Sequence, residues 1–147
     1  MRTIAPLSAI LLSALAAGAV AQQNAALPRT ASPAGAEAYI LSPANDAEVK
    51  SPVTVRFGLR GMGVAPAGVT NANTGHHHLL IDVDTLPPDN LPLPANDNVR
   101  HFGLGQTEVE LTLTPGTHTL QLVLGDALHI PHDPPVRSEK ITITVVE

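Results

Sequence analysis

The residues of this chain best suited to chemistry are its histidines, which number seven against eight lysines and arginines in 147 residues. Three are consecutive and lead into an apolar segment that alternates as β-strands do. Because successive strand side chains point to opposite faces, His76 and His78 are predicted on one, more open face, about 6–7 Å apart. That face is shared with Leu80 and Asp82. The opposite, core-facing set is predicted to be His77, Leu79, Ile81 and Val83.

A second pair, His129 and His132, lies in a proline-containing loop shortly after a predicted strand that ends near Asp126. If that strand pairs antiparallel with the histidine strand, the end of one lies beside the start of the other, and four imidazoles meet at one pole. Nitrogen ligands without thiolate suit Zn²⁺ or Cu²⁺. The sequence therefore predicts a zinc or copper site with the ligands His76, His78, His129 and His132.

Four further residues are predicted to support this site. Asp126 is expected to accept a hydrogen bond from one imidazole and orient it. Met62, between two glycines, offers a thioether that suits Cu(I), or else covers one end of the core. His101, at the exit of a proline-rich loop, is an auxiliary candidate. His118 has two interpretations: a ligand, or a corner residue hydrogen-bonded back to the preceding loop, as tyrosine is in immunoglobulin-type domains.

Two other functions remain open. An immunoglobulin-like interaction module would use its histidines as a polar, pH-responsive network that tethers loops, and would bind another periplasmic protein through the proline-rich loop Leu86–Pro94. Metal-dependent hydrolysis would need an acid near the imidazoles, for which Asp126 and Asp82 are the candidates. The chain has no Gly-x-Ser-x-Gly turn and no glycine-rich phosphate loop, so a carrier or sensor is expected rather than an enzyme.

The elements that must position these residues all have the pattern of short strands. Alternating apolar segments are separated by turns rich in proline, glycine and asparagine, and no stretch after the N-terminal region has a helical period. Six or seven such strands in about 110 residues favour an immunoglobulin-like antiparallel β-sandwich. A cupredoxin-like Greek-key barrel is the alternative. The core must be aliphatic, because Tyr39, Phe57 and Phe102 are the only aromatic residues of the Phe, Trp and Tyr types.

The N-terminal region predicts export. Residues 1–21 have the pattern of a secretory signal peptide, with cleavage expected after Ala21, although an apolar run of this kind can also act as a membrane anchor. Residues 22–37 are expected to be a flexible linker and residues 38–147 a single domain. The absence of cysteine excludes disulfides and thiolate sites. We therefore expect a periplasmic or secreted protein with no membrane anchor after cleavage. The net charge of −5, without a basic cluster, argues against nucleic acid as a partner.

Five blocks of the sequence stand out in order: Gly75–Asp82, Gly103–Glu108, Pro115–Asp126, His129–His132 and Pro134–Val136. Together they resemble a bacterial family of small exported domains catalogued only as a domain of unknown function. The resemblance extends from about Ile40 to Val146. One departure is Phe102-Gly103-Leu104, where the family pattern is richer in glycine. The resemblance implies an exported domain and carries no biochemical activity.

Overall fold

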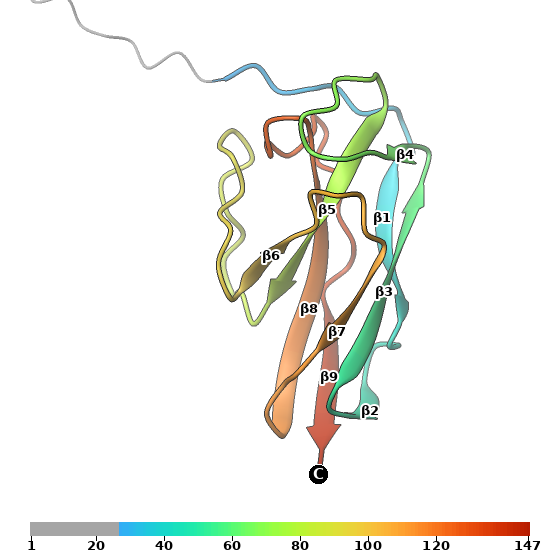
Figure 1. The fold of residues 1–147 in the computed structure, drawn as a ribbon, viewed down its shortest axis with the longest axis vertical. Coiled ribbons are helices and arrows are strands. Elements are labelled where there is room, and N and C mark those ends of the chain that lie inside the picture. The colour runs from blue at the N-terminus through green and yellow to red at the C-terminus, as the bar shows by residue number, and fades with distance from the viewer. Residues whose placement is uncertain (1–26) are drawn as a thin grey trace, which may run out of the picture.

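A computed structural model describes residues 27–147 and shows two β-sheets packed face to face, with no α-helix among these residues (Figure 1). The smaller sheet has the strand order β1-β3-β7, and the larger has the order β2-β9-β8-β5-β4, with β6 also paired to β5. The predicted β-sandwich is therefore confirmed. The strands are β1 Glu37–Ser42, β2 Ala47–Lys50, β3 Val53–Arg60, β4 Gly63–Val64, β5 Thr74–Ile81, β6 Val99–His101, β7 Glu108–Leu111, β8 Gly116–Gly125 and β9 Ile141–Val146.

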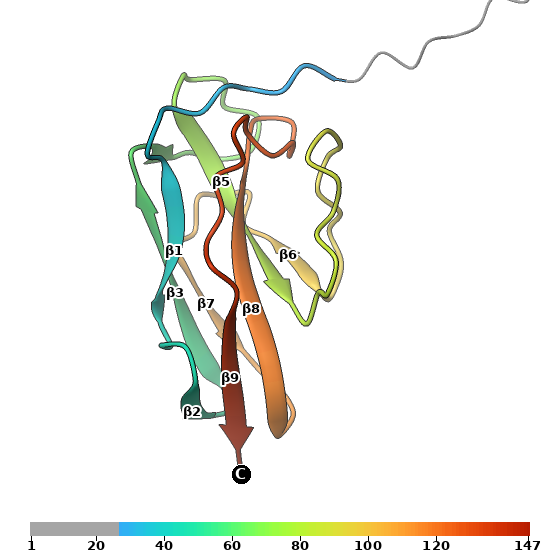
Figure 2. The same ribbon diagram turned by 180° about the vertical axis from the view of Figure 1, so that it is seen from behind.

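Most neighbouring strands are antiparallel, but two pairs are parallel. These are β2 with β9, and β4 with the first residues of β5. In both cases one partner is short: β2 has four residues and β4 has two. Figure 2 shows the larger sheet from behind, with β8 between β5 and β9.

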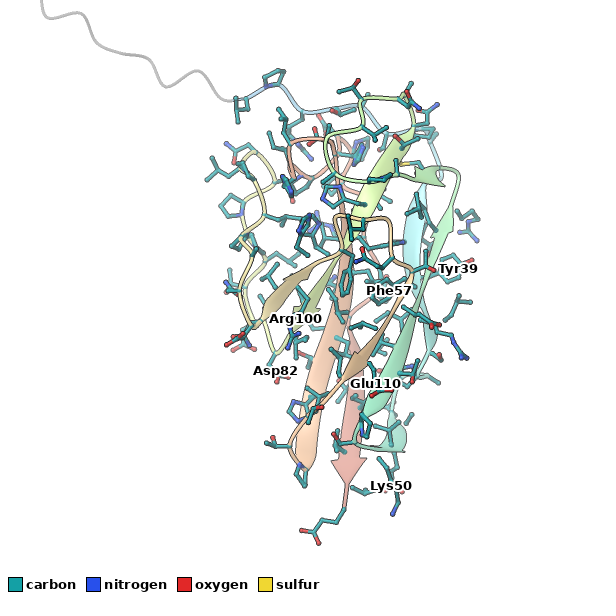
Figure 3. The ribbon with its side chains drawn as sticks, viewed as in Figure 1. Tyr39, Lys50, Phe57, Asp82, Arg100 and Glu110 are labelled. Atoms are coloured by element: carbon teal, nitrogen blue, oxygen red, sulfur yellow. The ribbon has the colours of Figure 1, made fainter. Side chains whose placement is uncertain are left out.

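The main core lies between the two sheets and is built from alternate residues of each strand. Phe57 of β3 points into it, as Figure 3 shows, together with leucines of β8 and valines of β3. Each fully buried aliphatic side chain contributes about 1.5–3 kcal/mol relative to exposure. Leu79 and Ile81 belong to this core, as the alternation of the histidine strand predicted.

A second, smaller apolar cluster covers the opposite face of the larger sheet. Leu80 and Val123 of the sheet are buried there under Leu93 and other residues of the loop between β5 and β6. Val83 packs in this cluster rather than in the core, because Asp82 has a positive φ of 55° and ends the alternation. The smaller sheet therefore covers one face of β5 and loops cover the other. The expectation that His76 and His78 share an open face is wrong, since each is 0% exposed.

Strands β5 and β8 pair antiparallel, with His76 opposite Gly125 and Ile81 opposite Leu120. The start of the histidine strand thus lies beside the end of β8, as the sequence predicted. The loop that follows β8 begins next to the first residues of β5 (Figure 1). This pairing brings the two predicted groups of histidines to the same end of the sandwich.

The predicted signal peptide, and residues 22–26 of the predicted linker, lie outside the described residues. Within residues 27–36 the chain is attached to the loop after β8: Arg29 donates to the carbonyl oxygens of Pro131 and His132, and Ser32 N donates to Asp133 O at 2.9 Å. Over residues 27–147 no helix has the length and apolar character needed to span a bilayer.

Candidate metal centre

The centre is built on two adjacent outward positions of β5. His76 and His78 both lie on the face that carries Leu80, and their ring centroids are 4.8 Å apart. All four of their ring nitrogens are buried and have no hydrogen-bond partner among the described residues. An imidazole buried without a partner costs roughly 1–3 kcal/mol for each unsatisfied group, so this pair is expensive to maintain unless something else binds it.

His101 joins this pair because β6 adds a three-residue strand to the edge of β5. The register places His101 directly opposite His78, where side chains of an antiparallel pair lie on the same face. The ring centroid of His101 is 5.1 Å from that of His78 and 5.0 Å from that of His76. A Cβ on Gly103 would come within 2.3 Å of the His101 ring, so the glycine two residues later leaves the room that this ring occupies.

His129 approaches from the loop after β8. It has a positive φ of 69°, a left-handed conformation that costs free energy for a residue with a side chain. Asp126 holds this conformation: its carbonyl oxygen accepts from His129 N at 2.9 Å, and its carboxylate Oδ1 accepts from the backbone N–H groups of Leu128 and Ile130. The left-handed turn brings the His129 ring to 4.9 Å from that of His76.

The four rings form one group. The two outer ones touch, with Nε2 of His101 and Nε2 of His129 3.1 Å apart. Ligand atoms of His76, His78 and His101 all lie within 4.8 Å of one another, which is a spacing that could hold a metal ion. His76 and His78 form the buried floor, whereas His101 is exposed and His129 partly exposed. An ion would therefore enter between the two outer rings.

The pocket favours neutral imidazoles. Burial, followed by the charges of His129 and His101, lowers the pKa of His76 from 6.5 to about 4. Burial, followed by the charge of His76, lowers the pKa of His78 to about 3, and burial lowers the pKa of His101. Neutral imidazole has the lone pair that a metal needs, so these rings are prepared as ligands at neutral pH.

Of the four ligands predicted from the sequence, the structure brings His76, His78 and His129 together. It places His132 elsewhere: its Nε2 is 3.2 Å from Thr74 O, and its ring lies on the other side of the first residues of β5, close to Gly75. His101, expected only as an auxiliary residue, takes the fourth place. His132 is separated from His129 because the chain reverses after His129 and carries Pro131 into a bridge with Gly125.

Asp126 also differs from expectation, whereas Met62 takes one of its two predicted roles. Both carboxylate oxygens of Asp126 are engaged in the loop, Oδ1 as described and Oδ2 by Thr30 Oγ1 at 2.7 Å, so Asp126 shapes the loop that carries His129 and orients no ring directly. Met62 is partly buried against the main core, so it covers the core and is not a ligand of the centre.

The remaining histidines lie outside the centre. His77 faces the main core, 5.2 Å from the Phe57 ring, and burial lowers its pKa to about 4. His118 is the predicted corner residue: its Nε2 lies 2.9 Å from Thr114 O, and its Nδ1 lies 2.7 Å from Asp82 Oδ2.

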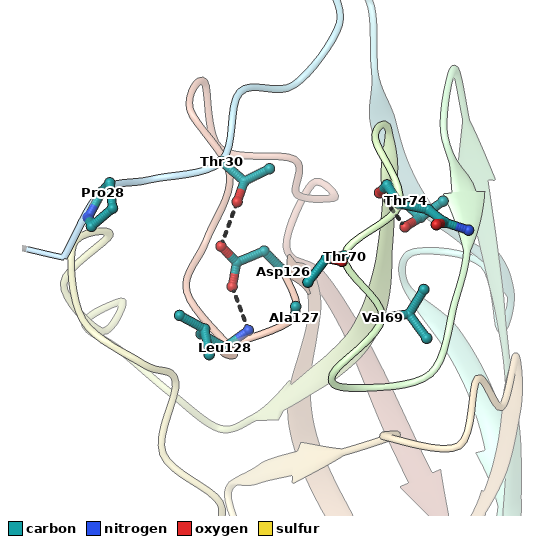
Figure 4. A pocket seen from close by; sticks show the side chains of 9 residues that line it. Pro28, Thr30, Val69, Thr70, Thr74, Asp126, Ala127 and Leu128 are labelled. Atoms are coloured by element: carbon teal, nitrogen blue, oxygen red, sulfur yellow. Dashed lines mark hydrogen bonds between the residues drawn. The ribbon is translucent and has the colours of Figure 1, made fainter.

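A hollow of about 230 Å³ is lined in part by Asp126, Ala127 and Leu128 of the loop after β8 (Figure 4). Figure 4 shows Thr30 and Leu128 bonded to the two oxygens of Asp126 at its edge. No histidine lines it. None of the four rings therefore lines this hollow, and one part of its wall is the hydrogen-bonded loop that positions His129.

Sequence reasoning missed the role of His101 because β6 is short and emerges from a proline-rich loop. A signal was nevertheless present: Val99-Arg100-His101 alternates, and Gly103 follows at a spacing that frees the ring of His101. Gly125 is a similar signal, since a Cβ there would come within 2.7 Å of the His78 ring.

Comparison with known proteins gives one match. The model of a family described as "Domain of unknown function (DUF4399)" matches residues 55–146. No curated protein and no solved structure shows significant similarity to the chain. The matched range contains β5, β6 and the loop after β8, so all four rings of the centre lie within it.

Proposed function

The chain belongs to the family described as Domain of unknown function (DUF4399), whose description assigns no activity, and we propose from the centre itself that this protein is a periplasmic carrier or sensor of zinc or copper. The ligands are His76, His78, His101 and His129. This set keeps three of the residues predicted from the sequence and replaces His132 by His101. The export pattern at the N-terminus supports the periplasmic location.

One observation carries the proposal: four imidazoles converge, while the inner two have no hydrogen-bond partner among residues 27–147. Lack of partners alone does not imply a metal, because both nitrogens of His77 also lack them. His77, however, is surrounded by apolar side chains of the main core, whereas His76 and His78 face two further imidazoles. An ion at the centre would satisfy one nitrogen each of His76, His78 and His101, and His129 would be its fourth ligand after a rotation of the rings.

The arrangement supports binding and release rather than catalysis. Four protein ligands fill the coordination of a tetrahedral ion and leave no position for a reactive water. The acids considered for hydrolysis are committed elsewhere, Asp126 to the loop and Asp82 to His118. The outer ligands stand on a strand edge and a loop, where they can open and admit the ion.

Calorimetric titration of tag-free protein with Zn²⁺ and Cu²⁺ at pH 7 tests the proposal. We expect saturable binding of one ion per chain, and a loss of affinity of about 100-fold or more in the double variant His76→Ala/His78→Ala. The matched control is His118→Ala, which removes a histidine hydrogen-bonded by Thr114 and Asp82 and leaves the affinity unchanged. Absence of saturable heat with both ions would refute the proposal.

The tethering network is the competing interpretation, and the 3.1 Å contact between His101 and His129 favours it. A network that only holds loops together has no need of metal. Under that interpretation, His101→Ala lowers the free energy of unfolding of metal-free protein, and added Zn²⁺ does not raise it. Under the proposal, Zn²⁺ at about 100 times its dissociation constant raises the free energy of unfolding by about 2.7 kcal/mol. Chemical unfolding with and without Zn²⁺ separates the two.

A further inference from the structure

The relative positions of the four rings contain information about which ion they fit. Four rings have six centroid-to-centroid distances, and these span 4.7–5.9 Å. Five of the six lie between 4.7 and 5.1 Å, and only the pair His78 and His129 is longer, at 5.9 Å. Near-equal distances among four points are the property of a tetrahedron.

Coordination chemistry gives the distances to compare with. A metal–nitrogen bond of about 2.0–2.1 Å, with a ring centre about 1.1 Å beyond the nitrogen, puts tetrahedral ring centres about 5.2 Å apart in all six pairs. A square-planar set instead has four pairs at about 4.5 Å and two opposite pairs at about 6.3 Å. If His78 and His129 were opposite one another, His76 and His101 would also have to be opposite, yet their centroids are 5.0 Å apart.

From this geometry we infer that the centre selects a tetrahedral ion, Zn²⁺, over Cu²⁺, which favours a square-planar or tetragonal arrangement. The inference rests on the proposed metal-binding function and narrows it to one ion. The donor set agrees, because four imidazoles suit Zn²⁺ and the thioether that would favour Cu(I) is absent: Met62 packs against the main core.

The rings need only small adjustments to close on an ion. Tetrahedral ligands lie about 3.3 Å apart at zinc–nitrogen distances of about 2.0–2.1 Å. The outer nitrogens of His101 and His129 are already 3.1 Å apart, while those of His76, His78 and His101 lie within 4.8 Å of one another. Because the ring centres already fit, we expect rotation of the inner rings about χ2 to bring their nitrogens inward without movement of the sheet.

Cobalt substitution tests the inference. Tetrahedral Co²⁺ absorbs intensely in the visible range, whereas six-coordinate Co²⁺ absorbs weakly. Full-length, tag-free protein is titrated with Co²⁺ and then with Zn²⁺. We expect an intense band that saturates at one equivalent and is lost as Zn²⁺ displaces Co²⁺. His101→Ala should weaken Co²⁺ binding and shift this band, because a water would take the place of the fourth imidazole. It is a safe variant for folding because His101 is exposed. His118→Ala should retain the band.

The outcomes separate the inference from the function on which it rests. A weak, six-coordinate spectrum in protein that still binds Zn²⁺ by calorimetry overturns the tetrahedral inference and leaves metal binding intact. A band and an affinity that are both unchanged in His101→Ala also overturn it, since His101 would then not be a ligand. Failure of both Co²⁺ and Zn²⁺ to bind overturns the proposed function itself.

Discussion

The histidines at the two ends of the β5–β8 pair differ in their hydrogen bonding. At one end, His118 near the start of β8 has a partner for each ring nitrogen, Asp82 for Nδ1 and Thr114 O for Nε2. Figure 3 shows Asp82 at the end of β5. At the other end, His76 and His78 have partners for none of their nitrogens among the described residues. The same residue type on the same strand pair is satisfied in one place and left unsatisfied in the other.

The difference appears in the pKa values. Burial alone would lower the pKa of His118, but the hydrogen bonds to Asp82 and Thr114 and the charge of Asp82 raise it. Burial, together with the charges of the neighbouring imidazoles, lowers the pKa of His78 to about 3, and no acidic group compensates. The corner thus stabilises a charged histidine that holds two segments together. The pocket instead keeps its clustered imidazoles neutral, and neutral imidazole is the form that binds a metal.

The largest expected effect concerns pH, where the two ends have opposite signs. His76, His77 and His78 have pKa values of about 4, 4 and 3, against 6.5 in the unfolded chain. Between pH 6.5 and pH 4 the unfolded state binds more protons than the folded state. The free energy of unfolding therefore decreases by about 1.4 kcal/mol for each ring with every unit by which the pH is lowered. His118, with its raised pKa, contributes stability that is present below pH 6.5 and is lost as pH rises through its folded value.

Chemical unfolding of metal-free protein from pH 8 to pH 4.5 measures this dependence. We expect stability to fall steeply below pH 6.5, with a slope approaching about 4 kcal/mol per unit for three rings. The variant His77→Leu should reduce the slope by about one third, because it removes one of the three titrating groups from the core. A stability profile that is flat between pH 6.5 and pH 4.5 would show that the three rings are protonated in the folded state and would remove the contrast between the two ends.

The second prediction compares His101 with His132, the residue that sequence reasoning preferred. His101→Ala removes one of the four converging rings and should weaken Zn²⁺ binding about 10- to 100-fold. His132→Ala removes a ring that lies by Thr74 O and should change the affinity less than about twofold, although it lowers stability by leaving a cavity. Competition with a zinc chelator measures both affinities. The reverse order would move the ligand set back to the one predicted from the sequence.

The third prediction concerns how the loop presents His129. Asp126→Ala removes the acceptor for the N–H groups of Leu128 and Ile130, which releases the left-handed turn and should weaken Zn²⁺ binding about tenfold. Asp126→Asn keeps an oxygen at the Oδ1 position and should restore most of the affinity. If Asp126→Asn binds Zn²⁺ as weakly as Asp126→Ala does, Asp126 acts on the ion through its negative charge and not by positioning His129.

The arrangement of the sheet could be predicted because it depends on local patterns. Alternation placed His77, Leu79 and Ile81 toward the core, and strand ends predicted that β5 and β8 bring their histidines together. Burial of the pocket could not be predicted in this way, because Leu93 and its loop cover the face of Leu80 through contacts with no periodic signal. The exchange of His132 for His101 depends on one left-handed residue and one three-residue strand, both too local for a pattern to reveal.

The smallest expected effect tests the corner. Asp82→Asn keeps an acceptor for Thr119 N but removes the charge opposite His118, which should lower the free energy of unfolding by about 0.5–1 kcal/mol, as for a partly exposed ion pair. The loss should be largest below pH 6.5, where His118 is charged, and should fade as pH rises through its raised pKa. Urea unfolding of variant and parent at pH 6 and pH 9 isolates this term, because the pocket affects both proteins equally. Zinc affinity should not change, since no corner atom belongs to the centre. An equal loss at both pH values would mean that His118 is held there as a neutral ring, and the two ends of the strand pair would then differ in hydrogen bonding alone and not in charge.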